Sequence, residues 1–290
     1  MEYWSIITLL ILHIQGRFNM RKFFVLLFFL VTVLVGCRQL PVGDVPNFTE
    51  KDLPSIDPIE IKGTLFNKTL KVVGLGDSLT EGVGDERQIS GYFGRLTAEM
   101  ENWAGVSDVQ AVNAAKKGRR SDQLLNQLDH QAIQEELKRS DIILMTIGGN
   151  DVMKIIKRDL FKLRTEPFYD ELKGYEERLE QIFTKIRSVN EEAVIIIGSL
   201  YNPFTVVADE ETELDHIIES WNEVIEQQVV ADGQSCYIQV QDLFHSNDNL
   251  VYHTDFFHPN AKGYEQMTNR YIEMINECNL KKLTNGNFDV

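Results

Sequence analysis

This sequence has few cysteines, few prolines and fewer basic than acidic residues. Its 290 residues include three cysteines, seven prolines and 29 Lys or Arg against 44 Asp or Glu, so the formal net charge is −15. The cysteines form no CxxC pair and no metal-binding spacing. A strongly acidic chain is a poor candidate for binding nucleic acid. The rest of the composition is that of a globular protein, and the length suffices for one α/β domain with a full core.

Several common nucleotide- and metal-binding motifs are also missing. The glycine-rich stretch VVGLGDSLTEGVGD, at positions 72–85, contains no lysine and is therefore no phosphate-binding loop. It is no dinucleotide fingerprint, because Leu79 stands where the third glycine belongs, and no GxSxG elbow, because Thr80 stands two positions after Ser78. The chain has no HExxH motif and no Cys/His cluster of the kind that binds zinc. We expect it to work without a metal or a cofactor.

The amino-terminal region has the features of a signal peptide. Two basic residues, Arg21 and Lys22, precede an uncharged apolar run of 13 residues at positions 23–35. A membrane-spanning helix needs roughly 20 residues, so this run fits the apolar region of a signal peptide better. Because Met20 directly precedes the basic pair, we expect translation to begin there.

The apolar run ends in LVGC, at positions 34–37, which resembles a bacterial lipobox. The resemblance implies that residues 1–36 are a leader and lipoprotein signal peptide, and that the thiol of Cys37 carries lipid after cleavage. The alternatives are an uncleaved membrane anchor or a core cysteine after an apolar strand. Residues 37–68 include four prolines among polar residues and are expected to be a tether. We therefore expect a lipid-anchored protein on the extracytoplasmic face of a bacterial cell membrane.

Apolar strands and amphipathic helices alternate through the predicted domain, residues 69–280, which a tail at 281–290 follows. Strands are predicted at 70–76, 109–115, 141–151, 193–200 and 236–244, and helices at 90–103, 121–137, 172–186, 214–225 and 261–276. Continuous apolar strands covered by helices imply a mostly parallel sheet. Cys236 lies in the last strand and is expected in the core; a disulfide between it and Cys278 is left open.

Four polar segments follow predicted strands and are expected to meet at the carboxyl edge of the sheet. Ser78 follows the first strand, Gly118 the second and Asn150 the third, and the segment DFFHP follows the fifth. In DFFHP, Asp255 stands three residues before His258. The carboxylate can then accept one ring N–H and leave the other ring nitrogen to face a serine. The alternative is a loop-capping aspartate beside an exposed histidine.

The four blocks GDSLTEG, GRRS, GGND and DFFHP, in this order, resemble the SGNH/GDSL hydrolase family. The resemblance implies a flavodoxin-like three-layer α/β/α sandwich with a five-stranded, mostly parallel sheet. It maps the family's markers onto Ser78, Gly118, Asn150 and His258, with Asp255 completing a catalytic triad. The block around Gly118, AAKKGRRS, departs from the apolar residues often found before that glycine.

The residues and the resemblance together predict a serine ester hydrolase. Ser78 attacks the ester carbonyl, His258 acts as base and then acid, and Asp255 stabilises the imidazolium. The backbone N–H groups of Ser78 and Gly118 and the side-chain amide of Asn150 form the oxyanion hole. Activity should fall below roughly pH 6, because the base must be neutral and an ordinary histidine has a pKa of about 6.5.

Three functions compete at this stage. A lipid- or acyl-ester hydrolase, such as a lipase, lysophospholipase, esterase or thioesterase, is favoured by the membrane tether and by the apolar segment 152–175, which lines an acyl groove, forms a lid or packs in the core. The alternatives are a carbohydrate O-acetylesterase acting on cell-surface glycans and a surface lipoprotein that binds without turnover. Asp77 is expected to cap the helix after the serine, and Asp151 to form loop hydrogen bonds.

Overall fold

The computed structural model describes residues 68–159, 164–204, 212–245 and 250–290. The predicted leader, Cys37 and the tether up to residue 67 lie outside these ranges. The described strands are β1 (Lys68–Gly76), β2 (Val106–Asn113), β3 (Ile142–Thr146), β4 (Val194–Gly198) and β5 (Ser235–Ile238). They form one sheet in the order β2-β1-β3-β4-β5, and every neighbouring pair is parallel. This confirms the predicted five-stranded sheet of flavodoxin-like order.

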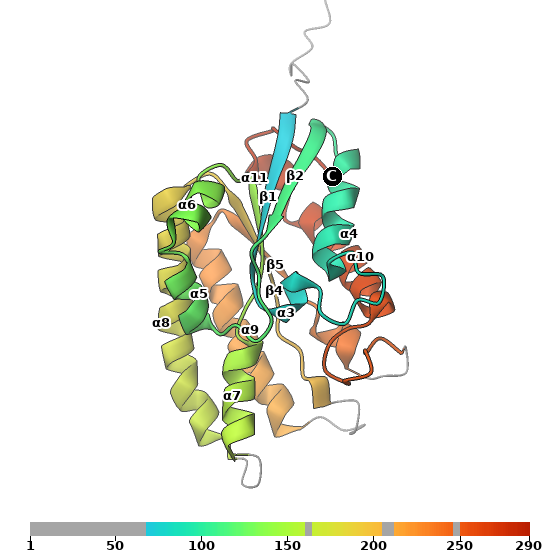
Figure 1. Cartoon of the computed structure of the whole chain (residues 1–290). Helices are drawn as coiled ribbons and strands as arrows, with labels where there is room; N and C mark the ends of the chain where they lie inside the picture. The colour runs from blue at the N-terminus through green and yellow to red at the C-terminus, as the bar shows by residue number, and fades with distance from the viewer. Residues whose placement is uncertain (1–67, 160–163, 205–211, 246–249) are drawn as a thin grey trace, which may run out of the picture. The chain divides into compact units, whose positions relative to one another are not determined.

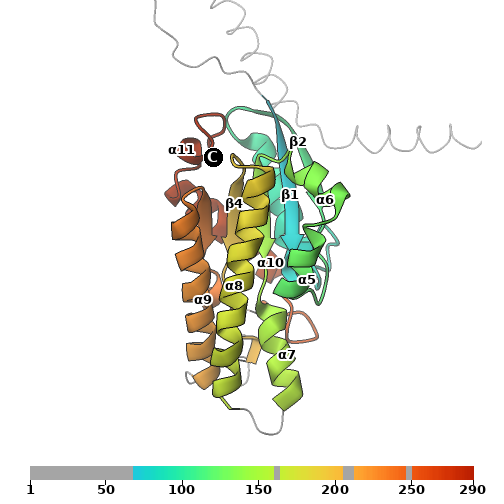
Figure 2. The same cartoon turned by 90° about the vertical axis from the view of Figure 1, so that its left-hand side faces the viewer.

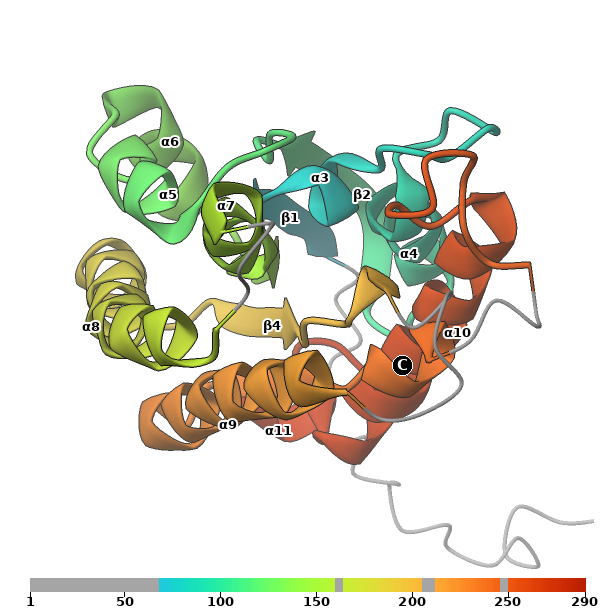
Figure 3. The same cartoon turned by 90° about the horizontal axis from the view of Figure 1, so that it is seen from below.

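Helices cover both faces of the sheet and complete the three layers (Figures 1 and 3). The helices are α3 (Ser78–Glu81), α4 (Gly91–Glu99), α5 (Ser121–Gln127), α6 (Gln131–Leu137), α7 (Gly149–Asp159), α8 (Glu166–Val189), α9 (Glu213–Asp232), α10 (Ala261–Glu277) and α11 (Leu280–Leu283). α4 and α10 lie on one face, and α5, α8 and α9 lie on the other, in front of the sheet in Figure 2. No described helix is both long enough and apolar enough to span a membrane.

The core consists of two layers of buried side chains, one on each face of the sheet. Every residue of β3 and β4 is buried, which explains why both strands are apolar along almost their whole length, with Thr146 as the polar last residue of β3. Alternate side chains point to opposite faces. The layer under α4 and α10 is rich in aromatic residues, including Tyr92, Tyr264 and Tyr271, whereas the opposite layer is mainly aliphatic around Trp221.

Three element boundaries differ markedly from the sequence prediction. The run predicted as a strand at 141–151 is a strand only over Ile142–Thr146, and its last three residues belong to α7 (Gly149–Asp159). The helix predicted at 121–137 is two helices, α5 and α6, which are separated by a turn at Leu128, Asp129 and His130. The strand predicted at 236–244 pairs only as far as Ile238. Beyond it, Gln241–Phe244 form a 3₁₀ turn that buries Phe244.

The carboxyl-terminal region is fastened to the domain. A disulfide joins Cys236 in β5 to Cys278 at the end of α10, with the two Cα atoms 5.9 Å apart. Residues 281–290, expected as a tail, instead pack against the domain. Phe288 is buried in the aromatic-rich layer, and the backbone of Asp289 pairs with that of Ala104.

Candidate active site

Ser78 stands at a sharp turn between β1 and α3, at the carboxyl edge of the sheet. Gly76 makes this turn possible, because its φ is +104° and a Cβ atom there would lie 1.9 Å from the Thr146 carbonyl oxygen. Asp77 caps the helix, as expected, since its carboxylate accepts the N–H of Leu79 at 3.1 Å. The serine is therefore presented by a short, fully anchored turn.

The structure brings Ser78, His258 and Asp255 into one chain of hydrogen bonds. His258 Nε2 lies 3.0 Å from Ser78 Oγ, and Nδ1 lies 2.6 Å from Asp255 Oδ2. The other carboxylate oxygen of Asp255 accepts the backbone N–H groups of Phe257 and His258, at 3.0 and 2.9 Å. Ser78 and His258 are only 4% and 5% exposed. The structure therefore brings the three side chains together, as the sequence predicted.

The surroundings of His258 and Asp255 determine the protonation states of these two side chains. Burial lowers the pKa of His258 below its usual 6.5, although the hydrogen bond to Asp255 and the charge of that carboxylate act against this. Burial also acts to raise the pKa of Asp255. The hydrogen bonds from the His258 ring and from two backbone N–H groups outweigh that effect and lower the pKa to about 2. Near neutral pH the histidine is therefore a neutral base beside an ionised carboxylate.

Asn150 lines the same cleft as Ser78, and the three candidate oxyanion donors differ in how they are anchored. The backbone N–H of Ser78 has no hydrogen-bond partner among the described residues, because the Asp77 cap takes the N–H of Leu79 instead. Asn150, at the start of α7, donates through its side chain to the Arg119 carbonyl at 3.1 Å. Gly118 lies one residue earlier in that loop, with a φ of +78° and open space around its Cα. The loop that carries Gly118 is thus tied to Asn150 through the carbonyl of Arg119.

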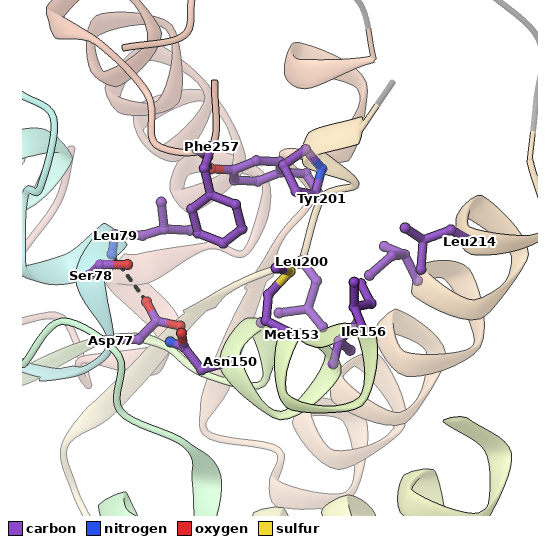
Figure 4. Close-up of a pocket in the computed structure, with 14 residues that line it drawn as sticks. Asp77, Ser78, Leu79, Asn150, Met153, Ile156, Leu200, Tyr201, Leu214 and Phe257 are labelled. Atoms are coloured by element: carbon purple, nitrogen blue, oxygen red, sulfur yellow. Dashed lines mark hydrogen bonds between the residues drawn. The ribbon is translucent and has the colours of Figure 1, made fainter. Parts of the chain in front are cut away.

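An apolar cleft opens beside Ser78 and runs along α7 and α9 (Figure 4). In the figure, Met153, Ile156 and Leu214 follow one another away from the serine, and Asn150 lies at the near end. The apolar lining consists of Leu79, Val152, Met153, Ile156, Leu200, Tyr201, Pro203, Leu214, Ile218 and Phe257. Within the segment 152–175, Val152 and Ile156 face this cleft while Phe168 packs in the core, and residues 160–163 lie outside the described residues.

The described residues offer no evident place for a metal ion. No three or more His, Cys, Asp or Glu side chains in the described ranges gather in a way that would ligate one.

Comparison with protein families identifies the fold and the class of enzyme. The model of the GDSL-like Lipase/Acylhydrolase family matches residues 75–266, a span that begins just before Ser78 and ends after His258. The chain belongs to this family. It is a GDSL hydrolase, in agreement with the resemblance of the four sequence blocks.

Two curated proteins are similar to this GDSL hydrolase. The uncharacterized protein YpmR of Bacillus subtilis is 37% identical over 221 residues, which cover 76% of this chain and 86% of YpmR. The spore germination lipase LipC of Bacillus licheniformis is 28% identical over 207 residues, which cover 70% of this chain and 94% of LipC.

Solved structures show the same fold. The lipase Lip_vut3 from a goat rumen metagenome has a TM-score of 0.63 and 27% identity, and the match covers 71% of this chain and 97% of the lipase. Axe2, an acetylxylan esterase from Geobacillus stearothermophilus, has a TM-score of 0.54 at 18% identity, covering 73% of this chain and 96% of Axe2. At this level of identity, the similarity to Axe2 shows a shared fold and nothing more.

Thr146 supports the serine turn of the GDSL hydrolase and was not found from the sequence. Its hydroxyl donates to Asp77 at 2.7 Å and accepts the N–H of Thr80 at 3.2 Å. Burial raises the pKa of Asp77 to about 7, although the hydrogen bonds from Thr146 and Leu79 act to lower it. The only sequence signal is a polar residue at the end of an apolar strand.

A second network fastens the start of α7, where Asn150 lies. Asp151 accepts the hydroxyl and the N–H of Ser121 at 2.6 and 3.0 Å, and Arg178 of α8 donates to that hydroxyl at 2.7 Å. Burial raises the pKa of Asp151, and the bonds from Ser121 and the charge of Arg178 oppose the shift. Asp151 is thus a hydrogen-bonding residue that ties α7 to α5 and α8, in agreement with its expected role.

The loop that carries His258 is held by aromatic residues that sequence reasoning also missed. The hydroxyl of Tyr201, after β4, donates to the Phe257 carbonyl at 2.6 Å. The Phe257 ring meets the His258 ring edge to face, with centroids 4.9 Å apart. The Tyr201 ring also packs against the Phe244 ring, with centroids 4.3 Å apart, so the loop contacts the aromatic core.

Proposed function

We propose that this GDSL hydrolase cleaves esters with Ser78 as nucleophile, His258 as base and Asp255 as the residue that orients the base. The observation that carries the proposal is the continuous hydrogen-bond chain from Asp255 Oδ2 through the His258 ring to Ser78 Oγ. The Ser78 hydroxyl gives its proton to Nε2 while the oxygen attacks the carbonyl carbon. Asp255, ionised near neutral pH, holds Nδ1–H and stabilises the imidazolium.

The second half of the reaction uses the same groups. Nε2–H of His258 returns the proton to the leaving alcohol, and the acyl group stays on Ser78 as an ester. A water molecule then loses a proton to Nε2, attacks that ester and releases the carboxylic acid. In both steps the negative charge on the carbonyl oxygen would be met by the free N–H of Ser78, the N–H of Gly118 and the amide of Asn150.

The cleft favours an acyl ester over an acetylated glycan. Its lining beyond Asn150 is aliphatic and aromatic, and its labelled side chains lead away from Ser78 in a row (Figure 4). An apolar acyl chain would remove this surface from water, at about 25 cal/mol for each Å² buried. An acetyl group would reach little of it. We therefore favour a lipid or other acyl ester as substrate.

We place the enzyme outside the cytoplasm, held to the membrane by lipid on Cys37. The signal-peptide features of residues 20–37 motivate this placement. The disulfide between Cys236 and Cys278 supports it, because disulfides persist in oxidising compartments and are rare in the cytosol. Metabolic labelling with a radioactive fatty acid tests the placement. Label should appear in the protein and be absent from Cys37→Ser.

The catalytic proposal is tested with the full-length protein in detergent and p-nitrophenyl esters from acetyl to palmitoyl. We expect activity to increase with chain length up to the capacity of the cleft, and Ser78→Ala to lose at least about 10³-fold in kcat. Circular dichroism of the variant checks that it folds. Undiminished activity of Ser78→Ala would refute the mechanism, and activity confined to the acetyl ester would favour the glycan alternative.

A further inference from the structure

Phe257 contacts both the apolar cleft and the proposed base. Its side chain lines the cleft together with Ser78 and Leu79. In Figure 4 its ring lies beside Leu79, at the serine end of the cleft. The same ring meets the His258 ring edge to face, with centroids 4.9 Å apart, which is a favourable arrangement of two aromatic rings. An acyl chain in the cleft and the imidazole would therefore contact the same side chain.

The backbone of Phe257 is held on both sides. Its N–H donates to Asp255 Oδ1 at 3.0 Å, and its carbonyl accepts the Tyr201 hydroxyl at 2.6 Å. The preceding residue, Phe256, has a φ of +53°, which a residue with a large side chain rarely adopts. This turn leaves the Phe256 ring 60% exposed, whereas the Phe257 ring lines the cleft. Because the backbone is held, rotation of the Phe257 side chain is the motion that a ligand in the cleft would restrict.

The contact between the two rings matters most while the acyl group is attached to the serine. In the free enzyme the His258 ring is held at both nitrogens, by Asp255 at 2.6 Å and by Ser78 at 3.0 Å. Once Ser78 is acylated, its Oγ carries no hydrogen and no longer donates to Nε2. The imidazole then keeps the hydrogen bond to Asp255 and the contact with Phe257, while Nε2 takes a proton from the attacking water. At this stage the acyl chain extends from Ser78 into the cleft, where Phe257 lies.

We propose that Phe257 is a positioning residue that couples an acyl chain in the cleft to the orientation of the His258 ring. The proposal rests on the proposed ester hydrolysis and specifies how that reaction selects among acyl chains. A long chain packs against the Phe257 ring and restricts its rotation, and the restricted ring holds the imidazole in place. An acetyl group is too short to have this effect. Contacts far from the reacting bond therefore raise kcat and do not only lower KM.

The test measures kcat and KM separately for p-nitrophenyl acetate, butyrate and octanoate at pH 8. The full-length protein is kept in a steroid detergent, so that no alkyl chain of the detergent competes for the cleft. Phe257→Leu keeps an apolar side chain in the cleft but removes the ring that contacts His258. Phe256→Leu is the matched control, because it makes the same exchange at the neighbouring residue, whose ring is exposed and lies outside the cleft lining.

We expect the wild-type kcat to be about tenfold higher for the octanoate than for the acetate, since small errors in position cost much rate. In Phe257→Leu the two values should agree within about twofold, while KM for the octanoate changes less than about threefold. Phe256→Leu should keep the wild-type ratio, and Phe257→Tyr should keep most of it because it retains the ring. A purely structural loss would lower kcat for every ester alike and leave the ratio unchanged.

Three results would overturn the coupling. The first is a wild-type kcat that does not depend on chain length. The second is a Phe257→Leu variant that keeps the wild-type ratio, or that changes KM alone, because Phe257 would then be an ordinary lining residue of the cleft. The third is a Phe256→Leu variant that loses the ratio as well, because the effect would then belong to the loop as a whole.

A measurement without turnover separates the coupling from ester hydrolysis. Ser78→Ala lacks the hydroxyl and so leaves Nε2 of His258 without that donor, as in the acylated enzyme. Relaxation of ¹³C placed at the histidine Cε1 reports fast motion of the imidazole, and the His258 signal is identified by its loss in His258→Gln. Adding 1-octanol, but not ethanol, should reduce this motion in Ser78→Ala and leave it unchanged in Ser78→Ala/Phe257→Leu.

The two measurements distinguish the possible failures. If the wild type cleaves no ester, ester hydrolysis fails and the relaxation measurement alone decides the coupling. If the esters are cleaved with a kcat that is independent of chain length, and 1-octanol does not change the motion of the imidazole, the coupling fails while ester hydrolysis stands.

Discussion

The turn that carries Ser78 and the loop that carries His258 are stabilised in opposite ways. Asp77 in the turn is buried and accepts hydrogen bonds from a backbone N–H and a threonine hydroxyl. Asp255 in the loop has a side chain that is 39% exposed, and it accepts two backbone N–H groups and the His258 ring. Burial raises the pKa of Asp77 to about 7, because it outweighs the hydrogen bonds there. At Asp255 the hydrogen bonds together outweigh burial and lower the pKa to about 2.

The difference shows which carboxylate is suited to work as an anion. Asp77 needs only an acceptor oxygen to hold the serine turn, and a neutral amide can supply that. In the proposed mechanism, Asp255 needs a negative charge beside the imidazole, because that charge stabilises the imidazolium formed during the reaction. Three predictions sharpen this contrast.

The largest expected effect separates the two aspartates by the same substitution. Asp255→Asn should lower kcat by about 10⁴-fold, because an amide can leave the histidine in the wrong tautomer. Asp77→Asn is the matched control and should stay within about tenfold of wild type, because its oxygen still accepts from Leu79 and Thr146. Steady-state kinetics on one p-nitrophenyl ester measure both. Equal losses would contradict the assignment of the charged role to Asp255 alone.

The next prediction concerns the free energy of unfolding and the segment around Asp85. Arg95 and Asp85 form a buried ion pair at 2.7 Å, and the segment around Asp85 contacts the start of α10, where Tyr264 donates to the Val83 carbonyl. Arg95→Ala should cost about 3–5 kcal/mol of unfolding free energy, because it leaves a buried carboxylate unpaired.

The control is Arg87→Ala, which removes an exposed contact to Glu265 at 3.9 Å. It should cost less than about 1 kcal/mol. Urea denaturation measures both variants, and an equal cost would show that the Asp85 segment does not depend on its buried pair.

The smallest effect is a shift in the pH profile. Activity requires neutral His258 and falls as pH drops through its pKa. Since burial lowers that pKa, the acid midpoint of kcat/KM should lie below 6.5. Lys117→Gln removes a positive charge that favours the neutral ring, so its midpoint should move upward by a few tenths of a pH unit. A wild-type midpoint above 6.5, or a downward shift in the variant, would contradict this account.

Local sequence patterns predicted the sheet well and the element ends less well. The runs at 142–145 and 194–197 are apolar without interruption, and only a strand covered on both faces needs that pattern. The break at 128–130 depends on how α5 and α6 pack, which the helical period does not record. The disulfide was left open because its cysteines lie 42 residues apart and meet only when α10 packs against β5.

In the candidate site, too, contacts between segments far apart in the chain could not be predicted from the sequence. Asp255 and His258 are three residues apart, so their contact could be predicted from spacing, and the blocks around Ser78 and Asn150 follow strands. Thr146 and Tyr201 were missed because each acts on a segment far away in the chain. Nothing in their immediate neighbours distinguishes them from ordinary strand-end residues.

The disulfide between Cys236 and Cys278 encloses the residues that bear Asp255 and His258 in a covalent ring, while Ser78 lies outside it. A protease that cut one peptide bond inside the ring would produce two fragments that remain linked. The base and its carboxylate would then stay tethered to the body of the enzyme. A nicked molecule would therefore migrate as one band without thiols and as two bands with them.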